Sequence, residues 1–187
     1  MEGGRNVKKN ARWITETAIL LALLVTLQAV TRGFGQLVTG SCVNAVLAAA
    51  ALVGGLASGL VVALCSPVLA FLLGIATQVL TVPAIMVGNS VYVVLLWFAA
   101  DRSGRNLLRQ IGAGLLAAAA KAAALYLLVA KLICGVLVDR LLAAGTLKEP
   151  MLKALPAAFS WPQLFTALIG GAAALLIVPI LRRALHR

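Results

Sequence analysis

The chain has 187 residues, of which 63% are hydrophobic and only 11% are charged, and its formal net charge is +11. Such an apolar composition excludes an ordinary soluble domain and indicates a polytopic membrane protein. The positive charge would suggest nucleic-acid binding in a soluble protein, but here Lys and Arg gather at the ends of apolar segments, where they set membrane topology, so we expect no nucleic-acid partner.

The longest feature of the sequence is a stretch without any Asp, Glu, Lys, Arg or His, from Gly33 to Ala100. As a single helix it would extend roughly 100 Å, whereas the hydrocarbon core of a bilayer is about 30 Å thick. The stretch must therefore fold back on itself within the membrane, most simply as three helices.

In chain order, the apolar runs predict an all-α membrane domain of six transmembrane helices over residues 13–182, between a basic segment at 1–12 and a basic tail at 183–187. The predicted helices are 13–30, 41–53, 57–73, 83–99, 108–138 and 161–181. The second is short, because we take Gly40-Ser41 as its entry and Gly54-Gly55 as its end. The segment 139–159 is predicted to be the longest loop.

An even number of helices puts both termini on the same side of the membrane. Most of the Lys and Arg residues lie on that side, so the positive-inside rule predicts cytoplasmic N- and C-termini. The sequence thus predicts a multi-pass protein of the plasma membrane, surrounded by lipid.

The sequence contains none of the motifs that carry common catalytic chemistry. H-E-x-x-H, G-x-S-x-G and phosphate-binding P-loop patterns are absent, and the five acidic residues fall at helix ends or in loops. We therefore expect no enzyme, no metal site and no cofactor. If the protein transports a substrate, its energy must come from a partner.

Two small residues, Ala18 and Ala22, lie four positions apart in the first helix and hence on one face. This spacing lets another helix approach closely. In an alanine-rich chain the same spacing also arises by chance, and the residues alone leave both readings open.

A few polar side chains interrupt the apolar helices. Ser41 and Asn44 share one face of the second helix, and Asn89 and Tyr92 share one face of the fourth. An asparagine in hydrocarbon is costly unless it is hydrogen-bonded. These residues either cap and join helices or line a polar pocket reached from outside. The similar depth of the two asparagines predicts that they converge.

The fifth helix carries Lys121 near the membrane midplane and Lys131 near its outer end. Lys131 either extends to the interface or meets an anionic group of a ligand, and for Lys121 we expect a functional or an assembly role. Ser160-Trp161-Pro162-Gln163 opens the sixth helix as a predicted capping box. Trp161 and Gln163 serve as anchor and cap or contact a ligand. The outer basic residues and Lys131 favour a ligand with an acidic or phosphate group.

Several segments, in their order along a chain of this length, resemble one known family: the membrane-embedded substrate-binding (S) components of energy-coupling factor (ECF) vitamin transporters. The resemblance covers nearly the whole chain. The segments are Gly40-Ser-Cys-Val-Asn44, Gly54-Gly55-x-x-x-Gly59, Ser66-Pro-Val-Leu-Ala-Phe-Leu-Leu-Gly74, Pro83-Ala-Ile-Met-Val-Gly-Asn89 and Phe159-Ser-Trp-Pro-Gln163.

The resemblance implies a protein that binds a vitamin or related micronutrient from outside with high affinity. The pocket would lie in the outer halves of the fourth to sixth helices, under the loops between helices 1–2, 3–4 and 5–6. The protein would associate with a transmembrane coupling subunit and two ATP-binding-cassette ATPases. It would topple in the membrane to deliver its substrate.

The resemblance also implies roles for individual residues. Ala18 and Ala22 match the family's Ala-x-x-x-Ala motif and would contact the coupling subunit. The predicted substrate-binding residues are Ser41, Asn44, Asn89, Tyr92, Lys131, Trp161 and Gln163. No signature identifies one vitamin.

Two other readings belong to different functional classes. A small membrane scaffold without a ligand would also tolerate alanine-rich helices with few polar residues. A stand-alone secondary transporter would show inverted repeats, but the second half contains no short segment to match the second helix.

Overall fold

All secondary-structure elements are helices in the residues that the computed structural model describes, which are 2–76, 78–101 and 106–184, with side chains described from Asn10 onward. The long helices are α1 (Glu2–Thr31), α2 (Gln36–Ala49), α3 (Leu56–Leu72), α4 (Val82–Ala99), α5 (Leu107–Leu125) and α8 (Trp161–Ala184). Shorter elements are η1 (Arg32–Phe34), η2 (Ala50–Gly54), η3 (Val79–Thr81), η4 (Tyr126–Val136), α6 (Val138–Ala143) and α7 (Glu149–Ala158).

Five helical segments in this part of the chain are long and apolar enough to cross a membrane. They are Asn10–Phe34, Gln36–Gly54, Val79–Ala99, Leu107–Val136 and Glu149–Ala184. A further apolar helix, α3, has 17 residues and a length of roughly 26 Å by the helical rise. The all-helical membrane class is confirmed, while the crossing of the membrane by exactly six helices stays a prediction.

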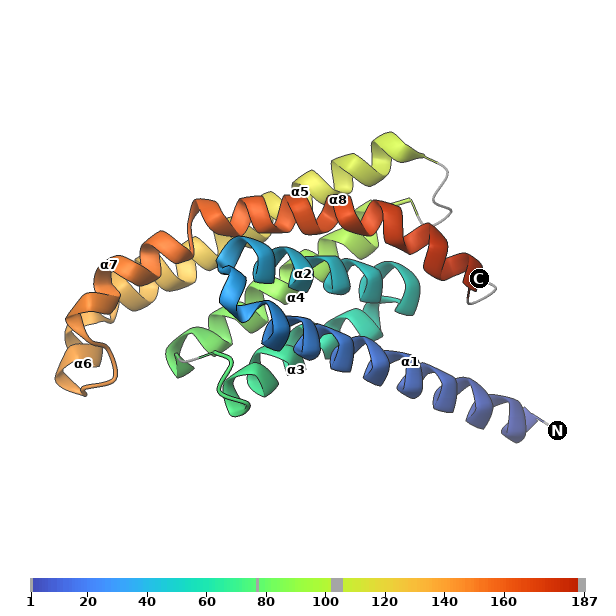
Figure 1. The fold of residues 1–187 in the computed structure, drawn as a ribbon, viewed down its shortest axis with the longest axis horizontal. Helices are drawn as coiled ribbons and strands as arrows, with labels where there is room; N and C mark the ends of the chain where they lie inside the picture. Colours follow the sequence, from blue (N-terminus) through green and yellow to red (C-terminus); the bar gives the residue numbers. More distant parts are fainter. Residues whose placement is uncertain (1, 77, 102–105, 185–187) are drawn as a thin grey trace.

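The helices form an elongated bundle in which α8 packs against α2 and α5, and α4 packs against α3 and α5. In Figure 1 the start of α1 and the end of α8 lie at one end of the bundle, and α6 and α7 lie at the other. The two ends of the bundle therefore differ: one carries the termini, and the other carries the extra helices.

The second helix is longer than the sequence predicts. It begins at Gln36 and continues through the π-helix η2 to Gly54, a span of 19 residues, so the prediction of a short helix starting at Ser41 is wrong. The boundary is Gly35, whose φ of +87° permits the sharp change of direction after η1. Gly40 lies inside the helix, where its missing side chain makes room for Thr166 of α8.

The fifth helix continues from α5 into the π-helix η4, which ends at Val136. Asn106 caps its start, because the side-chain oxygen accepts a hydrogen bond of 3.0 Å from the backbone N–H of Arg109. Of the predicted basic connector before it, Arg102 and Arg105 lie outside the described residues. The segment 139–159 is not simply a loop, because it contains most of α6 and all of α7, which starts with Pro150 in its first turn.

The remaining helix boundaries agree with the sequence to within one or two residues at most ends. α3 begins after Gly55, α4 has Pro83 in its first turn, and α8 begins at Trp161. The first helix extends further toward the N-terminus than 13–30, because the basic segment before it is also helical. Residues 185–187 of the predicted tail lie outside the described chain.

The core of the bundle consists mainly of alanine and branched aliphatic side chains, including Leu24, Leu47, Val62 and Val93. Small side chains allow close helix packing. In a membrane this packing is a main source of stability, because the surrounding lipid is as apolar as the side chains and the hydrophobic effect does not drive helices together. One buried polar contact joins α1 to α3, where the hydroxyl oxygens of Thr17 and Ser58 lie 2.9 Å apart.

We expect Gly35→Ala and Gly55→Ala each to lower the free energy of unfolding by about 1–3 kcal/mol, because φ values of +87° and +89° with extended ψ are open almost only to glycine. Neither added methyl group would meet an atom within 4 Å, so the loss measures backbone strain. Thermal unfolding in detergent checks the prediction. Gly33→Ala, in the same connector and also uncrowded, is the control and should change the midpoint little.

Candidate functional site

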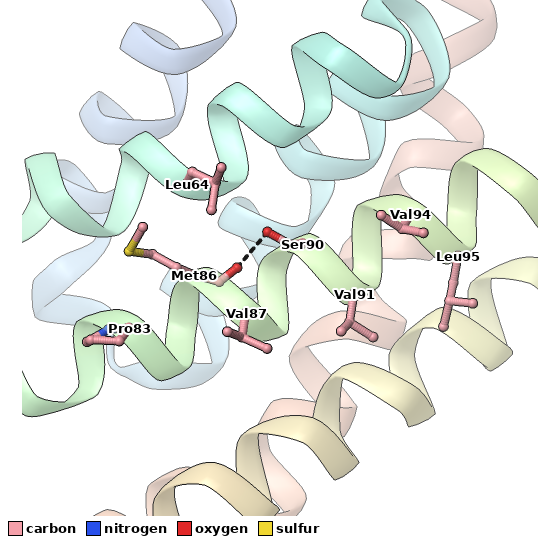
Figure 2. A pocket seen from close by; sticks show the side chains of 8 residues that line it. All are labelled: Leu64, Pro83, Met86, Val87, Ser90, Val91, Val94 and Leu95. Atoms are coloured by element: carbon pink, nitrogen blue, oxygen red, sulfur yellow. Dashed lines mark hydrogen bonds between the residues drawn. The ribbon is translucent and has the colours of Figure 1, made fainter.

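The described residues form two hollows of different chemistry. One is a groove of about 590 Å³ on α3 and α4. Figure 2 shows the lining residues, which are Leu64 of α3 and seven residues of α4. Ser90 is the only polar residue among them, and its hydroxyl donates to the carbonyl of Met86. This groove offers apolar contact alone, as expected of a surface that faces lipid chains.

The other hollow is a polar cavity of about 410 Å³, within the usual range of small-molecule sites. Its walls come from α1, α2, α3, α4, α5, α7, α8 and the connectors after α1 and α3. The lining residues are Gln28, Arg32, Gly35, Gln36, Thr39, Gly40, Val43, Asn44, Ala70, Ile75, Ala76, Gln78, Thr81, Ile85, Asn89, Lys121, Leu125, Leu155, Ala158, Phe159 and Gln163. We call the hollow that these residues line the polar cavity.

Lys121 of α5 is the centre of the cavity's polar network and is 3% exposed. Its Nζ donates to Oδ1 of Asn44 on α2 (2.5 Å) and to Oδ1 of Asn89 on α4 (2.7 Å). The same nitrogen lies 5.4 Å from the centre of the Tyr92 ring, within the range of a cation–π contact. Three helices therefore hold one buried cation with neutral groups.

Further hydrogen bonds connect this network to α8. Nδ2 of Asn44 donates to Oγ1 of Thr166 (3.3 Å), whose hydroxyl donates to the carbonyl of Gln163 (3.1 Å). The hydroxyl of the fully buried Tyr92 donates to the carbonyl of Ala167 (3.3 Å). The side chains around Lys121 are thus held in place by contacts within the protein.

Two buried polar atoms of the cavity have no hydrogen-bond partner in the described part of the protein. They are Nδ2 of Asn89, a donor, and Oε1 of Gln28, an acceptor. Buried polar groups in native proteins are almost always satisfied, and an unpaired one is costly. Both residues line the polar cavity, where ordered water or a bound molecule can supply the missing partner.

The structure brings together four of the seven predicted substrate-binding residues. Asn44, Asn89 and Gln163 line the polar cavity, and Tyr92 lies against Lys121. The expectation that the two asparagines converge is confirmed, because both bind the same ammonium group. Lys121 links the two asparagines. The sequence predicts that this lysine lies near the membrane midplane, where a charge costs free energy, but it does not indicate the residues that bind it.

The other three predicted residues lie outside the cavity's lining. Ser41 donates to the carbonyl of Leu37 within its own helix, at 2.6 Å. Lys131 is exposed and lies over the ring of Tyr126, and Trp161 is 71% exposed. Their contact with a substrate remains a prediction without support from this geometry.

The predicted capping box at the start of α8 is not formed. The hydroxyl of Ser160 donates to the carbonyl of Ala157, and the side chain of Gln163 donates to the carbonyl of Ala158. Both side chains reach back to α7, because that segment is a helix with carbonyl groups available at its end. Gln163 therefore connects α7 to α8 at the edge of the cavity.

Sequence reasoning missed several residues of the cavity. Gln28 is an uncharged polar residue near the end of an apolar helix. Because burying an unpaired amide there costs free energy, its presence could have indicated a polar site. Phe159, Leu155 and Ala158 come from α7, which was expected to be a loop. Their positions depend on packing between distant segments, which no local pattern shows.

The two small residues of the first helix lie away from the cavity. Ala18 and Ala22 are both exposed on α1, together with the large apolar side chains of Ile19 (61%) and Leu23 (47%). In an apolar 18-residue stretch of α1 only 11% of the residues are buried in the bundle, against 44% in the corresponding stretches of α2 and α4. This face is open to lipid or to another protein.

Comparison with known protein families gives one informative match. The family model described as "ECF transporter, substrate-specific component" matches residues 12–182, which is nearly the whole chain. Comparison with curated proteins and with solved structures gives no match.

Proposed function

Because the chain belongs to the family of substrate-specific components of ECF transporters, we propose that it captures a vitamin-like small molecule in the polar cavity and delivers it to a transport complex. The family consists of substrate-binding membrane proteins that are not enzymes and that work with a coupling component and ATPases. The protein is accordingly a multi-pass component of the plasma membrane.

The observation that carries the proposal is the pair of unpartnered polar atoms in the cavity. Oε1 of Gln28 and Nδ2 of Asn89 come from different helices and are buried without partners among the described residues. A ligand that accepts from Asn89 and donates to Gln28 would satisfy both. A scaffold without a ligand has no use for a cavity with such groups.

The position of the cavity supports capture from outside. Its walls include Gln28 near the end of α1, and Ala158 and Phe159 at the end of α7, toward the end of the bundle opposite the chain termini (Figure 1). With cytoplasmic termini, as the distribution of Lys and Arg predicts, the cavity lies toward the outer surface. We propose that α7 covers it.

Among the predicted residues, we propose that Asn44, Asn89 and Gln163 contact the substrate and that Tyr92 supports them. Ala18 and Ala22 are proposed to contact the coupling subunit, because they are exposed on the least buried membrane helix. The two proposed surfaces use different residues, so variants can separate binding from transport.

The proposed function is tested first by a thermal-shift screen of the purified protein against B vitamins and their precursors. Mass spectrometry of small molecules that co-purify with the protein accompanies it. We expect one compound to raise the unfolding midpoint, because a ligand that binds only the folded state stabilises it. A protein that carries no small molecule and responds to no compound would contradict the proposal and favour a scaffold.

The position of the site is tested by Ala158→Trp, with Ala157→Trp as its control. Ala158 lines the cavity, whereas its neighbour Ala157 is exposed and does not. The indole at 158 would occupy ligand space and weaken binding by about 5- to 150-fold, if the steric conflict costs about 1–3 kcal/mol as overpacking does. Binding measured by calorimetry should be unchanged at 157. Equal binding by both variants would place the site elsewhere.

A further inference from the structure

The buried cation at the centre of the polar cavity lacks an anionic partner. We infer that the substrate is a small carboxylic acid whose carboxylate binds Lys121, an inference that rests on the proposed function and names its substrate class. The bonded partners of Lys121 in the described protein are two neutral amide oxygens and the face of one ring.

The charges around the cavity argue for an anion. None of the residues described as lining it is Asp or Glu, while Lys121 and Arg32 both line it. An ionised side chain at membrane depth is costly and is usually paired with an opposite charge. Amide oxygens compensate only part of that cost, and a carboxylate of the substrate would supply the rest.

The hydrogen-bond donors argue for a carboxylate in particular. An ammonium group has three donors, and Lys121 uses two of them on Asn44 and Asn89. Nδ2 of Asn89 belongs to the same amide group as the oxygen 2.7 Å from Nζ, and it has no partner in the described chain. Two donors thus remain near one another, which suits the two oxygens of one carboxylate.

One negative charge fits this site better than two. Arg32, the other cation of the lining, is exposed, and its Nη1 donates to the carbonyl of Gly74 at 2.8 Å. A phosphate ester beside Lys121 would therefore leave one charge without a buried partner, and its dehydration would be costly.

The side chains that line the cavity indicate the chemistry of the substrate beyond its carboxylate. Phe159 is the only aromatic side chain among the described lining residues, so a large planar ring has no pair of aromatic faces to lie between. Val43, Ile85, Leu125 and Leu155 supply aliphatic contact, and Oε1 of Gln28 accepts from a hydroxyl or amide N–H. The volume of about 410 Å³ is near the lower end for drug-sized ligands. The substrate is therefore a small acid with a largely aliphatic, hydrogen-bonding body.

The first test uses the unaltered protein and matched pairs of acids and neutral analogues: pantothenate with pantothenol, biotin with biotinamide, lipoate with lipoamide, and nicotinate with nicotinamide. Riboflavin, thiamine and pyridoxal phosphate complete the panel. We expect an acid to bind about 10- to 100-fold more tightly than its neutral analogue, the range of one charge-assisted hydrogen bond. An acid identified by mass spectrometry as the co-purified compound supports the inference in the same way.

The opposite outcomes separate this inference from the proposed function. Tight binding of a neutral, cationic or phosphorylated compound, blocked by Ala158→Trp, would overturn the inference that the substrate is a carboxylic acid. It would leave the proposed function intact. The absence of any bound or stabilising compound would overturn both.

The second test asks whether Lys121 recognises the acid or only supports the fold. In Lys121→Met the acid should lose its 10- to 100-fold advantage over the neutral analogue, so that both compounds bind with affinities within about threefold of each other. An equal loss for both compounds would contradict recognition by Lys121.

A companion variant, Asn89→Asp, covers the case in which Lys121→Met does not fold. It places a carboxylate beside Lys121 at the position of the amide oxygen that now lies 2.7 Å away, so the cation gains an internal partner. We expect a folded protein that has lost its preference for the acid. A retained preference would overturn the inference.

Discussion

Replacing Ala18 and Ala22 together with tryptophan is expected to reduce substrate uptake by cells to the level of cells without the protein, while the purified variant still binds its substrate. Both residues are exposed on α1, of which an apolar 18-residue stretch has only 11% of its residues buried in the bundle. Small residues four apart allow another helix to approach closely, and two indole rings prevent that approach. Uptake of labelled substrate in cells that express the complete transporter, with calorimetry on the purified variant, makes the comparison.

The matched control is the pair Ala119→Trp and Ala123→Trp. These alanines have the same spacing on α5 and are also exposed. We expect this variant to transport normally, because α5 is not the proposed docking helix. Loss of binding along with uptake in the α1 variant would show that Ala18 and Ala22 support the fold, and loss of uptake in the control would place the interface on α5.

The largest effect on stability is expected from Gly170→Ala, in the middle of α8. A Cβ at this position would lie 2.5 Å from Cβ of Asn44 and 2.6 Å from the carbonyl oxygen of Ser41, so α2 and α8 would have to separate. Overpacking of this kind costs about 1–3 kcal/mol and more where backbone must move. The unfolding midpoint in detergent should fall clearly, and substrate affinity should fall with it because Asn44 holds Lys121.

Gly114→Ala is the control for this prediction. Gly114 is a helical glycine of α5 with no atom within 4 Å of an added Cβ, so the change should be neutral or slightly stabilising through helix propensity. A midpoint for Gly170→Ala equal to that of this control would mean that α2 and α8 are less closely packed than the structure shows.

Much of the fold follows from local signals in the sequence. Charge-free apolar runs predict membrane helices, and Pro83 and Gly55 mark real helix starts, because a proline suits a first turn and glycine allows a positive φ. The same reasoning was wrong at Gly40, which looked like the start of a helix. Inside membrane helices, glycine also serves as a packing site, and only the position of Thr166 reveals that use.

The candidate site was predictable in part. A buried amide such as Asn44 or Asn89 must find a partner in hydrocarbon, so the sequence could indicate that the two converge. It could not indicate that Lys121 joins them, because that contact depends on how α2, α4 and α5 pack. The π-helix η4 and the helix α7 within the predicted loop also lacked a local signal.

The network around Lys121 has a consequence for the kinetics and thermodynamics of capture. Its side chains are held by each other and by α8, so we expect binding to require little further ordering of the protein. Preorganised sites lose less conformational entropy and therefore gain affinity without additional contacts. We therefore expect the proposed substrate to dissociate slowly, because affinity differences between related complexes arise mostly in the dissociation rate.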